Sequence, residues 1–377
     1  MTENEAKRQP RALILLFSPS WMGPARLPET LHEAGFLVGS LCHGDSYLAQ
    51  SGFNSYLVAM PEEGSAWPNL VAAVRSERPD ILIPACDLAI RFLHNIVDAE
   101  NAGRLAPESA DVTGLVRRSL GDPQGHRRAA SKIELHALAE ELGLAVPRQV
   151  TAADIDQARA FADTTGYPVV LKGEYGAGGH AVRICATARE LEEAWQVLRQ
   201  QDAQQRLSVS EYVRGTLAAQ ANVSWDGEVL ETLTLAKIQT HPGPTGPSSV
   251  LQRVDHPAAE HTARVLIGRL GISGFSSVDL ILDEEHDRAV VLEINLRPTP
   301  GCMIGRLWGR DHGLVLASKL SGADYSPESM SESPQRVALF PNEWLRDRGS
   351  PHLIEDHHDV PWRDPRLLKA FVERLVR

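Results

Sequence analysis

Two acidic residues and an amide near residue 290 have the types and spacing of a site for a divalent cation. Asp279 lies in one β-rich run, and Glu293 and Asn295 lie in the next, beyond a polar turn at residues 283–288. If the two runs pair so that Asp279 faces Glu293, side-chain alternation puts Asn295 on the same face. Carboxylate and amide oxygens are hard ligands that suit Mg²⁺.

This hairpin also has an alternative interpretation. In the expected register Leu282 faces Val290, and the second face is apolar, with Val278, Leu280, Leu292 and Ile294. Two carboxylates directly opposite each other on neighbouring strands lie about 4.5–5.5 Å apart and repel, so a cation must offset them. An amphipathic edge hairpin with one solvated face would show the same pattern.

A glycine-rich loop with a lysine at its start is the second candidate. Lys172 ends an apolar run, the strand pattern resumes at residues 181–184, and glycines lie between them at positions 173, 176, 178 and 179. The pattern is strand–loop–strand, unlike a P-loop or a dinucleotide fingerprint. Backbone amides of such a loop can form an anion nest, and the lysine adds a charge for phosphate. An ordinary flexible turn is the alternative. Glu174, inside the loop, would disfavour phosphate unless it points away.

Composition and charge restrict the class of protein. A chain of 377 residues exceeds one core, so two or three domains are expected. The formal net charge of −11, with no long basic cluster, argues against nucleic-acid and membrane partners. The scattered cysteines, Cys42, Cys86, Cys185 and Cys302, indicate a reducing compartment. No apolar run has membrane-spanning length and the start is charged, so the expected location is the cytoplasm.

The first third of the chain alternates between strand and helix patterns. After a disordered lead at residues 1–11, we expect an open parallel-sheet α/β domain over residues 12–120. Its expected strands are 12–17, 36–41, 56–59 and 79–84. Ser18–Trp21 and Cys86–Asp87 follow two of these strands, where open sheets bind ligands.

The middle of the chain is predicted to mix helices with antiparallel strands. Asp226–Gly227 between β-rich runs predicts a tight hairpin of residues 218–225 and 228–237. Residues 241–249, rich in proline and glycine, are predicted to be a loop or lid. The predicted helices are 130–142, 154–164, 188–199 and 254–270, and a further strand is predicted at 207–213.

The order of these parts resembles the ATP-grasp superfamily, in particular its carbamoyl-phosphate synthetase, biotin carboxylase and carboxylate–amine ligase branch. The resemblance rests on Lys132 at a helix start, Lys172 with its glycine loop, the segment at residues 210–215, and Asp279 followed by Glu-Ile-Asn-Leu-Arg-Pro at 293–298. It implies an ATP-grasp module with two sheet-containing lobes over residues 121–325, with the glycine-loop lobe at about 145–210. Residues 326–377 are expected to form a C-terminal extension that packs on the body.

The resemblance also implies roles for individual residues. Lys132, Lys172, Gly176, Gly178 and Gly179 would hold the phosphates of ATP, and Glu211, Tyr212 and Val213 would receive the adenine. Asp279, Glu293 and Asn295 would hold one or two Mg²⁺ ions, with Mn²⁺ as a substitute. Arg297, Lys172 and Lys237 would be catalytic. Arg306 and Arg310 would pair with a substrate carboxylate through the planar guanidinium. Many relatives have an acidic residue where this chain has Ser210, so the ribose contacts differ.

The implied function is that of an ADP-forming ligase. It would phosphorylate a substrate carboxylate to an acyl phosphate and then form an amide bond with an amine, using small-molecule substrates; a homodimer is compatible with the resemblance. A small-molecule kinase of the same fold and a non-catalytic ATP-binding regulator are the alternatives. Retention of Asp279, Glu293, Asn295 and Arg297 argues against the regulator.

Overall fold

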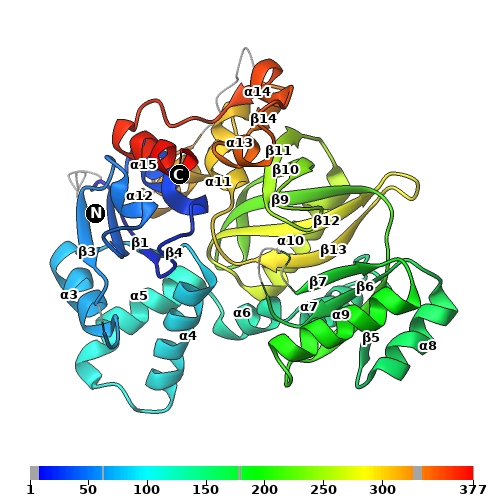
Figure 1. Ribbon diagram of the computed structural model, residues 1–377. Coiled ribbons are helices and arrows are strands. Elements are labelled where there is room, and N and C mark those ends of the chain that lie inside the picture. Colours follow the sequence, from blue (N-terminus) through cyan, green and yellow to red (C-terminus); the bar gives the residue numbers. More distant parts are fainter. Residues whose placement is uncertain (1–7, 62, 177–178, 180, 326–332, 377) are drawn as a thin grey trace.

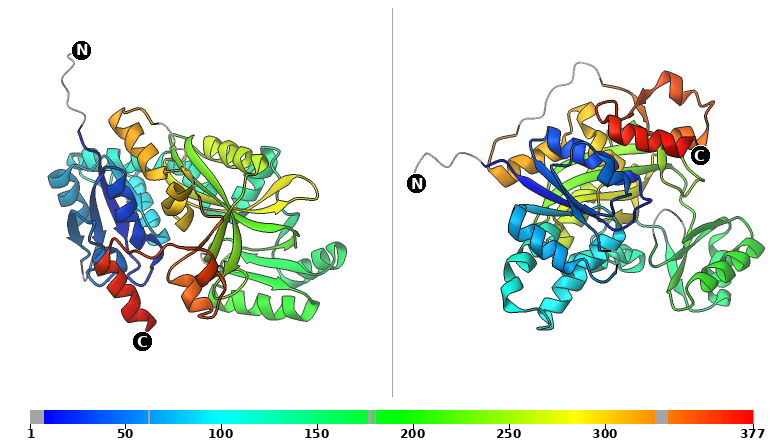
Figure 2. Two further views of the ribbon diagram at one scale, coloured as in Figure 1. Left: turned by 90° about the horizontal axis from the view of Figure 1, so that it is seen from above. Right: turned by 60° about the vertical axis from the view of Figure 1, so that its left-hand side comes forward.

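The computed structural model describes residues 8–61, 63–176, 179, 181–325 and 333–376, which form three sheets with their helices (Figures 1 and 2). One sheet belongs to the N-terminal domain, one carries the glycine loop, and the largest lies between the other two parts of the chain. The expected combination of a parallel α/β domain and antiparallel sheets is confirmed.

The N-terminal sheet is parallel, with strand order β3-β2-β1-β4. Its core is continuous because the apolar residues of β1 are fully buried. The strands are β1 (Arg11–Leu16), β2 (Leu37–Cys42), β3 (Tyr56–Ala59) and β4 (Ile81–Pro84). The helical elements are η1 (Gly23–Arg26), α1 (Leu27–Glu33), α2 (Tyr47–Gln50), α3 (Trp67–Glu77), α4 (Asp87–Asn101), η2 (Pro107–Ser109) and α5 (Ala110–Leu120).

The glycine-loop sheet is antiparallel, with order β5-β8-β6-β7. Its strands are β5 (Gln149–Ala152), β6 (Val169–Gly173), β7 (Val182–Cys185) and β8 (Leu207–Glu211). Helices α8 (Ile155–Thr165) and α9 (Ala188–Gln201) pack on it, and Asp154 and Thr187 cap their N-termini. Helices α6 (Pro123–Ala130) and α7 (Lys132–Glu141) connect this part to the first domain.

The large sheet has the order β13-β12-β9-β10-β11-β14-β15. Asp226 and Gly227 both have positive φ, which confirms the predicted hairpin turn. Helix α10 covers one face, and the short helices α11 and α12 lie on the other, toward the first domain (Figure 1). The elements are β9 (Thr216–Trp225), β10 (Glu228–Thr240), β11 (Ser248–Arg253), α10 (Pro257–Leu270), β12 (Gly274–Asp283), β13 (Arg288–Asn295), α11 (Pro300–Ile304), η3 (Gly305–Trp308) and α12 (His312–Ser321).

The predicted register of the β12–β13 hairpin is only half correct. Asp279 does face Glu293, but a bulge follows, so Leu282 faces Ala289 instead of Val290. The extra residue shifts the alternation, and Val291 joins the buried apolar face in place of Leu292. The Leu292 carbonyl oxygen lies 2.9 Å from Nε2 of the buried His136.

The segment after β10 also differs from the prediction. Residues 248 and 249, expected in a loop, begin strand β11, and helix α10 begins at Pro257 instead of residue 254. Proline and glycine correctly mark the turn at 242–247. A strand of only six residues has too few alternating apolar and polar residues to be distinguished from the helix that follows it.

The C-terminal segment contains short regular elements. They include α13 (Asn342–Arg346) and β15 (His357–His358). Strands β14 (Arg336–Ala338) and β15 extend the large sheet. Helix α14 (His352–Glu355) follows α13, and α15 (Pro365–Leu375) packs on the first domain, so the segment bridges both parts (Figure 2).

Candidate active site

Lysines neutralise the two facing carboxylates of the β12–β13 hairpin. Lys237 on β10 lies 2.7 Å from Asp279, and Lys132 at the start of α7 lies 3.0 Å from Glu293. The predicted need for positive charge beside this pair is therefore met by the chain itself. The Lys237–Asp279 pair spans strand β9 on one face of the large sheet, and the Lys132–Glu293 pair joins helix α7 to its edge strand β13.

Lys132 and Lys172 form a positive wall behind Glu293. Both side chains are buried, so neither lysine is a solvated surface charge. Lys132 also donates to the Gly176 carbonyl oxygen at 2.9 Å, which ties α7 to the glycine loop. The Nζ of Lys172 has no hydrogen-bond partner among the described residues. A buried ammonium group without a partner is costly, which favours a site built for an anion.

Burial and neighbouring charges shift the pKa values of this cluster. Burial lowers the pKa of Lys172 to about 8; Glu293 opposes this shift and Lys132 adds to it. Burial raises the pKa of Asp279, helped by Glu293 and opposed by Lys237. Burial also acts to raise the pKa of Glu293, but Lys132, Lys237 and Lys172 together bring it below its ordinary value. The lysines therefore favour the ionised form of Glu293 more strongly than that of Asp279.

Glu174 points away from the glycine loop. Its carboxylate accepts hydrogen bonds from Ser131 at 2.7 Å and from Arg206, and Ser131 also caps helix α7. The anion inside the loop is therefore neutralised on the far side of the strand. It acts as a structural link between α7 and the glycine-loop sheet.

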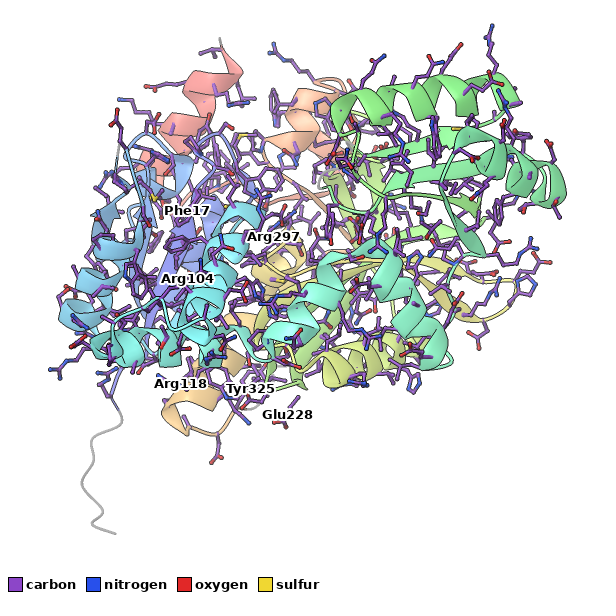
Figure 3. The ribbon with its side chains drawn as sticks, turned by 90° about the horizontal axis from the view of Figure 1, so that it is seen from below. Phe17, Arg104, Arg118, Glu228, Arg297 and Tyr325 are labelled. Atoms are coloured by element: carbon purple, nitrogen blue, oxygen red, sulfur yellow. The ribbon has the colours of Figure 1, made fainter. Side chains whose placement is uncertain are left out.

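Arg297 lies at the junction between the large sheet and the first domain (Figure 3). Its Nε is 3.3 Å from Asp87, at the start of α4, and its guanidinium lies 5.3 Å from the centre of the Trp21 ring. Both partners follow strands of the first sheet, where the sequence predicted a contribution to a ligand site. The first domain thus orients the guanidinium predicted to be catalytic.

A cavity of about 870 Å³ opens beside this cluster. The predicted residues that line it are Gly179, Lys237, Asp279, Glu293, Asn295, Arg297 and Arg306. The two predicted lid loops meet at its edge, since a Cβ built on Gly179 would collide with the carbonyl oxygen of Thr245. Gly179 has φ of +75°, a conformation that favours glycine.

Other predicted residues lie outside this cavity. Glu211, Tyr212 and Val213 follow the end of β8, where Arg148 forms a 2.7 Å ion pair with Glu211. Arg310 pairs with Glu231 at 3.1 Å and does not line the cavity, so its substrate role stays a prediction. Gly178 lies outside the described residues.

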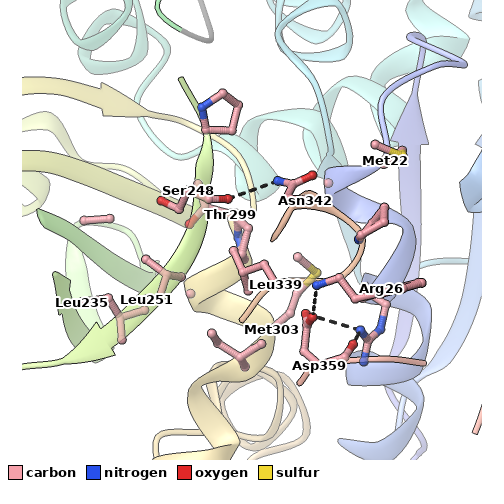
Figure 4. A pocket seen from close by; sticks show the side chains of 18 of the residues that line it. Met22, Arg26, Leu235, Ser248, Leu251, Thr299, Met303, Leu339, Asn342 and Asp359 are labelled. Carbon is pink, nitrogen blue, oxygen red and sulfur yellow. Dashed lines mark hydrogen bonds and ion pairs between the residues drawn. The ribbon is translucent and has the colours of Figure 1, made fainter. Parts of the chain in front are cut away.

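Sequence reasoning did not name the residues that the C-terminal segment contributes to the cavity. Leu339, Asn342 and Asp359 line it, and Asp359 pairs with Arg26 at 3.4 Å (Figure 4). These residues have no motif, and only their long-range contacts bring them to the site. Asn342 donates to the Ser248 carbonyl oxygen at 3.1 Å, for example.

The oxygen donors at the hairpin fit a magnesium ion that also binds phosphate. Asp279, Glu293 and Asn295 supply two carboxylates and an amide, and all three line the cavity. No group of three His, Cys, Asp or Glu residues in the described part of the chain has the arrangement of a metal site. Mg²⁺ takes few protein ligands and completes its coordination with water and phosphate oxygens.

Comparisons with known proteins agree with the resemblance seen in the sequence. Residues 131–299 match the family model of the carbamoyl-phosphate synthase L chain, ATP binding domain. The N-terminal section of the carbamoyl phosphate synthase large chain from Methanopyrus kandleri is 23% identical over 232 residues. That match covers 59% of this chain and 40% of the relative, so the chain spans less than half of the relative's length.

Solved structures share the fold. Biotin carboxylase from Campylobacter jejuni matches with a TM-score of 0.62 and 16% identity, over 86% of this chain and 73% of that one. The biotin carboxylase domain of 2-oxoglutarate carboxylase from Hydrogenobacter thermophilus, a dimer in complex with MgADP, matches with a TM-score of 0.60 and 15% identity, over 86% and 71%. The chain shares the fold of these solved structures and residues 131–299 match an ATP-binding domain, in agreement with the ATP-grasp resemblance.

Within the described residues, no helix combines the length and the apolar character needed to cross a membrane.

Proposed function

We propose that this protein is an ATP-dependent ligase that phosphorylates a substrate carboxylate and couples the acyl phosphate to an amine, releasing ADP and phosphate. The observation that carries the proposal is the charge cluster on the large sheet. Three lysines surround the facing pair Asp279 and Glu293 beside a large cavity, within a segment that matches an ATP-binding domain. Phosphoryl transfer needs such an excess of positive charge.

The proposal assigns the nucleotide to the space between the two antiparallel sheets. Lys132, Lys172 and the glycine loop would hold its phosphates. The adenine would lie at the end of β8, where the Glu211 carboxylate is engaged with Arg148. Recognition of the adenine would therefore depend mainly on the backbone of Tyr212 and Val213.

Asp279, Glu293 and Asn295 would hold Mg²⁺, which supplies charge neutralisation beside the terminal phosphates when bound. Lys237 and Arg297, next to these residues on the cavity wall, would orient the substrate carboxylate and neutralise the transferred phosphoryl group. A carboxylate oxygen attacks the γ-phosphorus and ADP leaves. The amine then attacks the acyl carbon, phosphate leaves and the amine loses a proton. The loops that meet at Gly179 and Thr245 would keep water from the acyl phosphate.

The test is product analysis with ATP, Mg²⁺ and a panel of carboxylic acids, with and without amines. We expect ADP and phosphate in equal amounts, and a hydroxamate when hydroxylamine replaces the amine. Glu293→Gln should abolish both products. An exposed variant, Glu260→Gln, serves as the control, since Glu260 lies on the surface of α10.

Two outcomes would favour the alternatives. A stable phosphorylated product without phosphate release would indicate a kinase. Tight ATP binding with no turnover by any acid in the panel would indicate a regulator.

The proposal also includes a cytoplasmic location and a homodimer. All four cysteines are free and buried thiols, which suits a reducing compartment. Sedimentation velocity would test the dimer.

A further inference from the structure

The cavity has two chemically different halves. One half contains the charged residues of the large sheet described above. The other is apolar, and residues from the sheet, from α11–η3 and from the C-terminal segment form its wall (Figure 4). The wall residues that carry the argument are Leu235, Leu251, Met303, Leu307, Leu339 and Phe340.

Strand register connects the two halves on one face of the large sheet. Asp279 faces Ala219, and Ala219 faces Leu235 on the next strand. Leu251 on β11 lies directly opposite Lys237. From Asp279 on β12 to Leu251 on β11 there are three strand spacings, or roughly 14 Å. The apolar wall therefore begins beside the lysine predicted to act on the substrate carboxylate.

Three arginines around the apolar half are already paired with carboxylates. Arg26 lies between Glu29, at 3.5 Å, and Asp359, at 3.4 Å. Arg306 and Arg363 both pair with Glu33.

Arg374 also lines the cavity, and its guanidinium lies 5.9 Å from the centre of the Tyr47 ring. A charged substrate group beside Arg26, Arg306 or Arg363 would have to break an existing pair and be desolvated.

The wall from the C-terminal segment is firmly attached. The backbone amide of Leu339 donates to the Ser249 carbonyl oxygen at 2.8 Å, and Leu339 is 3% exposed. Leu235, Leu251 and Leu339 belong to one packed cluster with Val337 and Trp308. The surface facing the cavity is therefore built in place and does not depend on a mobile loop.

Given the proposed function, on which this inference rests, we propose that the carboxylic acid substrate carries an uncharged, apolar group of the size of a leucine or phenylalanine side chain. Its carboxylate lies at Lys237 and Arg297, and its apolar group packs against the half-buried side chains of Leu307 and Phe340. The paired charges around this half discriminate against acidic, basic and phosphorylated side groups.

The experiment compares acids that share the carboxylate and differ only in the side group. Leucine, phenylalanine, 4-methylpentanoate and 3-phenylpropanoate form the apolar set; aspartate, lysine, O-phosphoserine and glutarate form the charged set. Binding is measured calorimetrically with Mg²⁺ and a nonhydrolysable ATP analogue, and ADP formation is measured separately with ATP. We expect at least tenfold tighter binding and a tenfold higher kcat/KM for members of the apolar set.

Two leucines of one apolar cluster provide matched variants. Leu307 is half-buried and packs against the cluster that contains the buried Leu233, but of the two only Leu307 lines the cavity. Leu307→Ala should raise the KM for the best apolar acid about tenfold and leave the KM for ATP unchanged. Leu233→Ala should change neither KM.

The outcomes separate this inference from the proposed function. Preference for a charged acid, equal effects of the two alanine variants, or no binding of any apolar acid would overturn the inference. Binding of the apolar set without ADP formation would count against the ligase reaction and support the apolar subsite.

Discussion

The two facing carboxylates are held together by charges from other parts of the chain. Lys237 pairs with Asp279, Lys132 pairs with Glu293, and Lys172 lies buried behind them. These residues serve two purposes in our account. Without ligand they neutralise one another, and with nucleotide and metal the lysines can turn to phosphate oxygens while the carboxylates turn to the metal.

Lys172 predicts a specific pH dependence of stability. Its folded-state pKa of about 8 is below the ordinary value of 10.5 because the side chain is buried. Between these values the unfolded chain binds more protons than the folded chain, so this residue makes the free energy of unfolding rise with pH. The Lys172→Met variant lacks this contribution to the pH dependence of the free energy of unfolding. Urea unfolding of both proteins from pH 7 to 10.5 should show the wild type gaining stability relative to the variant, and parallel curves would contradict the account.

Glu293→Gln should destabilise the protein even without ligand. The substitution leaves Lys132 and Lys172 buried without their main counter-charge, which we expect to cost on the order of 3 kcal/mol. Relief of the repulsion with Asp279 is a smaller effect, because Lys237 already neutralises that carboxylate. Thermal and urea unfolding in the presence of a chelator measure the loss of stability. An unchanged or raised melting temperature would mean that repulsion dominates the hairpin.

At the scale of elements, the contact between two loops closes the candidate site. The glycine loop joins β6 to β7, and the loop at 241–247 joins β10 to β11, so each loop is part of a different sheet. They approach each other at Gly179 and Thr245, and both residues line the cavity.

Gly179→Ala tests this contact against a control at Gly143. Both glycines have positive φ, +75° and +70°, so alanine has a similar backbone cost of about 1 kcal/mol at each. Only at Gly179 does the added methyl group meet another loop, since Gly143 faces open space. We expect Gly179→Ala to lower kcat at least tenfold and Gly143→Ala to leave it within twofold. Equal kcat values would show that the loops need not meet during turnover.

At the scale of the whole molecule, the C-terminal segment joins the first domain to the large sheet. Strand β14 pairs with β11, while Asp364 accepts hydrogen bonds from Ser51, at 2.7 Å, and from the Gly52 amide. Because the same segment lines the cavity, its attachment determines both the domain arrangement and the shape of the apolar half.

Asp364→Ala should loosen this attachment. Asp364 caps helix α15 and also bonds to the first domain, whereas Asp154 only caps α8. Loss of a cap costs about 1 kcal/mol, and the lost interdomain bonds add about 1–3 kcal/mol. Unfolding experiments should therefore show a larger loss for Asp364→Ala than for Asp154→Ala. Limited proteolysis should remove the C-terminal segment of the first variant faster, and equal cleavage rates would argue against its bridging role.

The structural features that the sequence predicted correctly are those that depend on local residue patterns. The parallel first sheet, the turn at Asp226–Gly227 and the facing of Asp279 and Glu293 all follow from short-range periodicity and turn chemistry. The bulge after Asp279, the pairing of Lys237 with that residue and the cavity wall around Leu339 depend on contacts between distant segments. Periodicity carries no information about such contacts.

Oxygen-isotope transfer tests the central claim most directly. The acid is labelled with ¹⁸O in its carboxylate, and the products of a full reaction with ATP and an amine are analysed by mass spectrometry. If the carboxylate attacks the γ-phosphorus beside Lys237 and Arg297, one ¹⁸O per turnover appears in inorganic phosphate and none in the nucleotide. Label in AMP, with pyrophosphate as the second product, would contradict both the mechanism and the placement of the phosphates.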